Sequence, residues 1–265
     1  MMPMRPPRSA LLRLAASTLA LALSLVAAPA AADRRETPPG TGERHAFEAG
    51  PVAGVLHLPP SGAARPAPAV ILLHDSLGHN PRGARYADQL LGAGLVVLDI
   101  ARHDDTPEAI RHAVAALSAH PRVQGAPTGL LGFGAGARLA MRLPEGIAAR
   151  GLLYPGCATL PALAEAAPPG PVLLLHGEDD PANAPESCAA AAATLARGRH
   201  AIRLIGYADA GYAWDYPAYG HERRLRLPPP EGGERIPVEP WPELVTLSAT
   251  TVARFFATTL VTMPR

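Results

Sequence analysis

The sequence contains no lysine; all 24 of its basic residues are arginine. This absence excludes a Walker A phosphate loop, a pyridoxal Schiff base and a serine–lysine dyad, because each of them needs a lysine amine. No basic run alternates with aromatic residues, so nucleic acid is a poor candidate partner. The sequence also has no internal repeat. What remains is a protein whose expected partner is a small-molecule ligand or substrate.

Cysteine is scarce too: Cys157 and Cys188 are the two in the chain, so one intramolecular disulfide at most can form. Cys157 follows one predicted strand and Cys188 the next. Both can therefore approach one edge of a sheet within the Cα separation of about 4.4–6.8 Å that a bridge needs. If they stay reduced, Cys157 becomes a candidate nucleophile instead. The sequence leaves both alternatives open.

Residues 1–32 have the pattern of a secretory signal peptide. Three arginines precede an apolar run over 14–28, and an Ala-x-Ala cleavage pattern ends at residue 32. An uncleaved membrane anchor is the alternative. Removing the three arginines changes the formal charge from +1 to −2 (1 − 3 = −2). We predict an exported protein, periplasmic or secreted, whose single domain spans 33–265 and has no membrane contact after cleavage.

The rest of the chain alternates apolar runs with helical patterns. The residues predict strands at 69–76, 95–101, 128–134, 149–156, 171–180 and 201–210, after a short antiparallel pair within 45–60. Helices are expected near 83–93, 107–119, 184–197 and 241–260, with a long surface loop at 216–240. Runs that are apolar on both faces and separated by helices indicate a buried, mostly parallel sheet. Ligand sites in such sheets lie at the carboxyl ends of the strands.

A glycine-rich turn connects the strand at 128–134 to a helical pattern that ends at Leu143. Its sequence, GFGAG (132–136), has the layout of a nucleophile elbow, G-x-Ser-x-G or G-x-Cys-x-G. Gly134 stands where the nucleophile would be, and glycine adopts the strained backbone of such a turn at little steric cost. We therefore predict an intact elbow with an empty nucleophile position. The Ala135 N–H at the start of the helix favours an anion there.

Four stretches, in this order and spacing, resemble the dienelactone hydrolase branch of the α/β-hydrolases over roughly residues 50–260. LLHDSLGHNP (72–81) is similar to that family's H-E-x-x-G-x-N-P loop, and GLLGFGAGARLAMRL (129–143) to its elbow. LLLHGEDDPANAP (173–185) resembles its acid loop and GYADAGYAWD (206–215) its histidine loop. The resemblance implies an α/β-hydrolase fold, a mostly parallel sheet flanked by helices with a minimal cap.

The resemblance places two of the three catalytic positions on unreactive residues. The family's acid falls on Asp180, its nucleophile on Gly134 and its histidine on Tyr212. Tyrosine is a poor base, with an ordinary pKa of about 10. Its hydroxyl could still donate a hydrogen bond to Asp180, which would make Asp180 a structural residue.

The resemblance also places the family's oxyanion N–H groups on Ser76 and Ala135. Asp75 falls on an acidic position that faces the thiol in the family. Replacement catalytic groups are few: Ser76 follows a strand but fits the role of a backbone donor better than that of a nucleophile. His221, on the predicted loop, could serve as a relocated base, although a solvated loop histidine is the simpler interpretation.

The remaining histidines and acids do not predict a metal site or any other cofactor. The candidates considered are His79, His103, Asp104 and Asp105. Their spacing matches no zinc-ligand signature, and Asp105 precedes a helix start. His74 and His176 end strands, where we expect hydrogen-bonded structural residues.

Two classes of function fit these residues. The first is a non-catalytic descendant of a hydrolase that binds a small ligand, such as an anion, in the old pocket. The second is an active hydrolase of small esters or lactones that uses relocated catalytic groups. We favour the first, because losing a nucleophile and its base costs about 10⁶ in rate.

Overall fold

The structure, a computed structural model, describes residues 42–60, 66–102, 106–143, 145–164, 168–217 and 225–261. The predicted leader and the predicted domain start at residue 33 lie outside these ranges. His103, Asp104, Asp105 and His221 do so as well.

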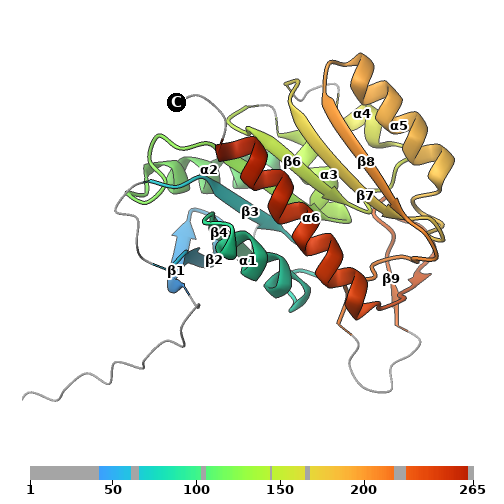
Figure 1. The fold of residues 1–265 in the computed structure, drawn as a ribbon, viewed down its shortest axis with the longest axis horizontal. Coiled ribbons are helices and arrows are strands. Elements are labelled where there is room, and N and C mark those ends of the chain that lie inside the picture. The colour runs from blue at the N-terminus through green and yellow to red at the C-terminus, as the bar shows by residue number, and fades with distance from the viewer. Residues whose placement is uncertain are drawn as a thin grey trace, which may run out of the picture. The chain divides into compact units, whose positions relative to one another are not determined.

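An eight-stranded sheet runs through the described residues in the order β1-β2-β4-β3-β5-β6-β7-β8 (Figure 1). The strands β3 to β8 are parallel, whereas β1 and β2 form an antiparallel pair that joins the edge of β4. The strands are β1 (Glu43–Ala49), β2 (Val52–Leu58), β3 (Ala69–Leu73), β4 (Val96–Arg102), β5 (Thr128–Phe133), β6 (Ala149–Leu153), β7 (Pro171–Gly177) and β8 (Ala201–Tyr207). The mostly parallel sheet that the sequence predicts is thus confirmed.

Helices cover both faces of this sheet. They are α1 (Arg82–Gly92), α2 (Pro107–Ala119), α3 (Ala135–Arg142), α4 (Leu160–Ala164), α5 (Pro185–Arg197) and α6 (Pro242–Val261). The helices α1 and α6 pack side by side on one face, and the other four contribute to the core of the opposite face (Figure 1).

Local sequence explains where the elements begin and what they bury. All five residues of β3 are buried, as expected for a strand covered on both faces. The helix α2 starts at Pro107, and the Thr106 hydroxyl accepts a hydrogen bond from the Ala109 N–H as a helix cap. The C-terminal α6 is long and apolar enough to cross a membrane by length and composition, but its buried residues belong to the core on the α1 face.

The predicted long loop at 216–240 is the main difference from the sequence-based expectation. Within its described part, β9 (Arg226–Leu227) and β10 (Ile236–Pro237) pair as a small antiparallel hairpin. We call residues 225–240 the strap, because contacts described below hold them across the elbow. The short helix α4 was not predicted either; five residues are too few to show helical periodicity.

Candidate functional site

The elbow predicted at Gly134 is present between β5 and α3. Gly134 has φ 52° and ψ −114°, a conformation that residues with side chains rarely adopt. Its N–H donates to the Leu153 carbonyl (2.9 Å), which holds the turn against β6. A Cβ on Gly136 would lie 2.2 Å from the Leu73 carbonyl oxygen, so glycine there lets α3 approach β3. The glycine pattern therefore builds the sharp strand–turn–helix of an elbow.

Three side chains surround the place where a nucleophile would project. A Cβ built on Gly134 would lie 3.4 Å from Asp75 Cβ, 3.5 Å from Tyr212 Oη and 3.7 Å from Pro230 Cγ. None of these groups is a nucleophile in this setting. Burial, followed by the negative charges of Asp75 and Asp180, raises the pKa of Tyr212 further above its ordinary value. Tyr212 therefore stays protonated and cannot act as a base.

The prediction that Tyr212 donates a hydrogen bond to Asp180 is wrong. The Tyr212 hydroxyl instead donates to the Pro228 carbonyl oxygen (3.0 Å) on the strap. The Asp180 carboxylate turns into its own loop, where it accepts from the Ala182 N–H (2.9 Å) and the Asn183 amide (2.8 Å). Such short-range bonds from an aspartate to the backbone two residues on are intrinsic to turns, so they form without a partner from another loop.

Asp180 is buried, and this burial raises its pKa to about 6, although the hydrogen bonds from Ala182 and Asn183 oppose the shift. Asn183 was not predicted as a site residue. Its side-chain oxygen accepts from the Gly156 N–H (2.8 Å), which ties the acid loop to the loop after β6. The sequence signal for this role is the Asp-x-x-Asn spacing of 180–183.

The same two loops are joined covalently. Cys157, after β6, forms a disulfide with Cys188 in α5, with a Cα separation of 4.9 Å. Both residues are fully buried. Cys157 consequently offers no thiolate to the site, which removes it as a relocated nucleophile.

The predicted oxyanion residues lie beside the elbow. Asp75 follows β3, forms an ion pair with Arg82 and accepts a hydrogen bond from the Leu77 N–H (3.0 Å). The side chain of Ser76 is exposed, and Ala135 begins α3 directly after Gly134. Helix geometry leaves the first N–H groups of α3 without acceptors inside the helix.

The strap covers the elbow from the side of α4. Besides Pro228 and Pro230, it contributes Glu231, whose carboxylate accepts from the N–H (2.9 Å) and hydroxyl (2.8 Å) of Thr159. The same carboxylate lies 3.6 Å from the Arg138 guanidinium on α3. These contacts hold the strap beside the first turns of α3.

A cavity of about 190 Å³ remains next to the first turn of α3, under the strap. It is lined by His74, Ala135, Gly136, Arg138, Leu139, Arg142, Leu163 and Pro230. Arg142 is exposed and has no acidic partner among the described residues, whereas Arg138 is shared with Glu231. The cavity therefore combines two guanidinium groups with a helix N-terminus, and both attract anions.

On the α1 face of the same edge lies a buried polar network that the sequence did not predict. Arg82 pairs with Asp75 and donates to the Tyr154 hydroxyl (3.0 Å). The Asp215 carboxylate accepts from Tyr154 (2.6 Å) and Tyr86 (2.9 Å). Burial lowers the pKa of Arg82, but Tyr154, Asp215 and Asp75 together raise it well above the ordinary value. Every charged group of this network is thus buried and paired.

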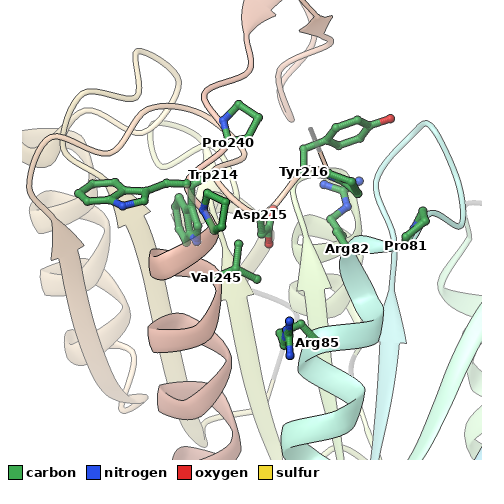
Figure 2. Close-up of a pocket in the computed structure, with 11 residues that line it drawn as sticks. Pro81, Arg82, Arg85, Trp214, Asp215, Tyr216, Pro240 and Val245 are labelled. Carbon is green, nitrogen blue, oxygen red and sulfur yellow. The ribbon is translucent and has the colours of Figure 1, made fainter. Parts of the chain in front are cut away.

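Outside this network the surface forms a shallow pocket of about 240 Å³ (Figure 2). It lies between α1, which carries Arg82 and Arg85, and the start of α6, which carries Val245. Trp214, Tyr216 and several prolines complete its walls. Because Arg82 is already paired with Asp75, the cation that this pocket can offer a ligand is the exposed Arg85.

The histidines at the ends of strands hydrogen bond as expected of structural residues. His74 Nε2 lies 2.7 Å from Asp99 Oδ1, and His176 Nδ1 lies 3.0 Å from the Gly177 carbonyl oxygen. His79 also contacts Asp99, through Oδ2 (3.2 Å). The structure thus groups His79 with His74 and Asp99, and Asp99 had not been considered as a site residue from the sequence.

Comparison with known proteins assigns this architecture to a class. No family model and no curated protein sequence matches the chain. Among solved structures, a dienelactone hydrolase from Anabaena variabilis is 19% identical, with 83% of this chain and 99% of that chain covered at a TM-score of 0.63. A dienelactone hydrolase-like promiscuous phosphotriesterase from metagenomic libraries is 18% identical, with 83% and 99% covered and a TM-score of 0.63.

A third solved structure, Est1E from Butyrivibrio proteoclasticus, is 14% identical, with 82% of this chain and 100% of that chain covered and a TM-score of 0.56. The chain therefore has the fold of the dienelactone hydrolases and of related α/β-hydrolase esterases. At these identities the likeness establishes the fold, and the site residues have to be judged by their own chemistry.

Proposed function

We propose that the protein is a non-catalytic relative of the dienelactone hydrolases that binds a small anion beside its elbow. The observation that carries the proposal is Gly134, which has the backbone of a nucleophile position and no side chain to attack with. Tyr212, at the position of the base, is buried, protonated and hydrogen-bonded to the strap. Losing both groups costs a hydrolase about 10⁶ in rate.

The cavity next to α3 supports an anion as the ligand. The first turn of α3 offers N–H groups, and Arg138 and Arg142 bring positive charge to the same cavity. Its volume of about 190 Å³ suits a carboxylate or phosphate group rather than a large molecule. Binding there would reuse the part of the elbow that in a hydrolase stabilises an oxyanion.

The signal-peptide pattern and the disulfide support an exported protein. A chain with a signal-peptide pattern at 1–32 and a buried disulfide fits an oxidising compartment, periplasmic or extracellular. The proposal needs no cofactor. N-terminal sequencing of protein recovered outside the cytoplasm should begin at or near Asp33, and recovery of Met1 would contradict export.

Calorimetric titration with acetate and with inorganic phosphate, in a buffer free of other small anions, tests the binding. Wild type should bind one anion, and Arg142→Ala should weaken binding about tenfold or more, as expected for loss of a charged hydrogen-bond donor. Arg254→Ala, an exposed arginine on α6, is the matched control and should leave binding unchanged. Equal effects of the two variants would mean that the anion does not sit in the cavity.

Ester turnover separates this function from the alternative, a hydrolase with relocated catalytic groups. We expect no turnover of p-nitrophenyl acetate by wild type beyond a low background. Gly134→Ser combined with Tyr212→His restores a serine, a histidine and Asp180, and should raise the rate. Efficient turnover by wild type that Asp180→Asn abolishes would establish the alternative instead.

A further inference from the structure

A group of three potential metal ligands lies beside the elbow, on the face that α1 covers. His74 follows β3, His79 lies in the loop before α1, and Asp99 lies in β4. In the sheet register Leu72 pairs with Asp99, so Asp99 and His74, two residues beyond Leu72, share one face. One ligand atom from each of the three residues lies within 4.8 Å of the others.

The three ligand atoms lie close enough to converge on a single small ion, which would take the place of the two hydrogen bonds to Asp99. The ligand atoms of a tetrahedral zinc ion lie about 3.3 Å apart, so His74 and Asp99 would have to separate by a few tenths of an ångström. His74 Nε2 and His79 Nε2 lie 2.7 Å and 3.2 Å from the two oxygens of the Asp99 carboxylate. Two imidazole nitrogens and one carboxylate oxygen are a ligand set that zinc accepts, with water in the fourth position. Magnesium and calcium prefer sites built from oxygen alone. The donor chemistry therefore selects a transition-metal ion of the zinc type.

The surroundings hold two ligands rigidly and leave one accessible. The side chain of His74 is 1% exposed and that of Asp99 10%, whereas that of His79 is 44% exposed. An ion can thus reach the three ligands from solvent on the His79 side, while His74 and Asp99 form the buried wall of the site. Gly83 of α1 belongs to this wall, since a Cβ there would lie 3.0 Å from His74 Cε1.

No other group in the described part of the chain competes for a metal in this way. His74, His79 and Asp99 are the one set of three or more histidine, cysteine, aspartate or glutamate residues found close enough there to share an ion. Both cysteines are locked in the disulfide. His57 on β2 is the diagonal neighbour of Asp99, since it pairs with Val97 of β4.

We propose that His74, His79 and Asp99 bind one zinc-type divalent ion, which ties the 74–80 loop to β4. This loop carries Asp75 and Ser76, so the ion would fix the donors next to the elbow. The affinity should be moderate, because His74 Nδ1 is buried and has no hydrogen-bond partner. Loss of such outer-shell partners typically weakens metal binding about 10–100-fold.

Metal titration of untagged, full-length protein treated with chelator tests the site. Zn²⁺ should bind at one ion per chain, and Co²⁺ should give the visible absorption of a low-symmetry site. At a zinc concentration about a hundredfold above the Kd, the Tm should rise by about 5–10 °C. Mg²⁺ at the same concentration should cause no shift.

Two variants and a control assign the ion to these residues. His79→Ala and Asp99→Asn should each weaken zinc binding about a hundredfold or more and abolish the Tm shift. His112→Ala is the matched control, since that histidine is also exposed, on α2 beside Glu108. Should Asp99→Asn fail to fold, His79→Ala decides alone. Absence of binding by wild type, or unchanged binding by His79→Ala, would overturn the site.

Discussion

The elbow and the Arg82 network lie at the same edge of the sheet and differ in the groups that they present: the elbow has backbone N–H groups, and the network has charged side chains. At the elbow, the backbone around Gly134 has the sharp strand–turn–helix geometry of a nucleophile turn, and Gly134 itself carries no side chain. In the network, each charged side chain is buried against a partner, as Arg82 is against Asp75 and Tyr154. The first turn of α3 beside the elbow has N–H groups without acceptors inside the helix, whereas the charged side chains described in the network each face a charged or hydroxyl partner.

This difference shows why charged residues in a hydrolase-like fold are a weak sign of catalysis on their own. A group that acts on a ligand must be free to form a hydrogen bond or an ion pair with it. In the network, the Asp75 carboxylate is paired with Arg82, and the Asp215 carboxylate accepts hydrogen bonds from Tyr154 and Tyr86. The network therefore stabilises the α1 face, whereas the anion binding that we propose relies on the N–H groups at the start of α3.

The largest expected effect comes from breaking the network. Arg82→Met keeps much of the side-chain volume but leaves Asp75 and Asp215 buried without their cation. Removing one partner of a buried ion pair typically destabilises a protein by about 3–5 kcal/mol. Urea unfolding at pH 7 should show a loss of this size.

Arg85→Ala is the control for this variant, because Arg85 lies one turn further along α1 and is exposed. It should change the free energy of unfolding by no more than about 0.5 kcal/mol. If Arg82→Met behaves like Arg85→Ala, the network does not stabilise the fold, and the contrast with the elbow fails.

The sequence predicted the fold well because the relevant signals are local. Runs such as AVILL in β3 indicate buried strands, and the order of runs and helical patterns defines a parallel sheet. The elbow was equally predictable, since its three glycines stand at alternating positions of one five-residue turn, 132–136. The strap was missed because its partners are distant in sequence: Glu231 accepts a hydrogen bond from Thr159, and the Pro228 carbonyl accepts one from Tyr212.

The side-chain partners were predicted less well because they are distant in sequence. Tyr86 and Asp215 are 129 residues apart, and His74 and Asp99 are 25 apart, so no spacing rule connects them. For Asp180 the expected donor was Tyr212, because it stands at the position of the family's histidine. In the structure the nearby Asn183 amide donates to Asp180 instead. Local hydrogen-bond options have to be considered before distant ones.

The pH dependence of stability sharpens the comparison, because Asp180 lacks the cation that Asp75 has. Burial raises the pKa of Asp180 from 3.8 to about 6, so the folded state favours the protonated form. The resulting stability is fully present below pH 3.8 and is lost as the pH rises through about 6. A difference of this size between the pKa values of the folded and unfolded states corresponds to about 3 kcal/mol.

Urea unfolding of wild type and of Asp180→Asn at several values between pH 3.5 and pH 7.5 measures the contribution of Asp180 to the free energy of unfolding. Relative to wild type, Asp180→Asn should lose the downward slope of stability between about pH 4 and pH 6. Parallel pH profiles of the two proteins would mean that Asp180 is ionised at little cost, and that the elbow side also holds its acid in a satisfied state.

The smallest of the three effects tests whether glycine is at the elbow for its backbone. Alanine at position 134 has room, because its Cβ would contact Asp75, Tyr212 and Pro230 at 3.4–3.7 Å. Its cost is therefore backbone strain alone, about 1–3 kcal/mol for a side chain held at φ 52° and ψ −114°. Gly92→Ala, at the end of α1 with nothing within 4 Å of the added Cβ, should instead be neutral or slightly stabilising. Thermal unfolding of both variants, compared at one pH, separates strain from the general effect of replacing a glycine. If Gly134→Ala is as stable as Gly92→Ala, the turn is not strained, and the absence of a nucleophile needs an explanation other than relief of that strain.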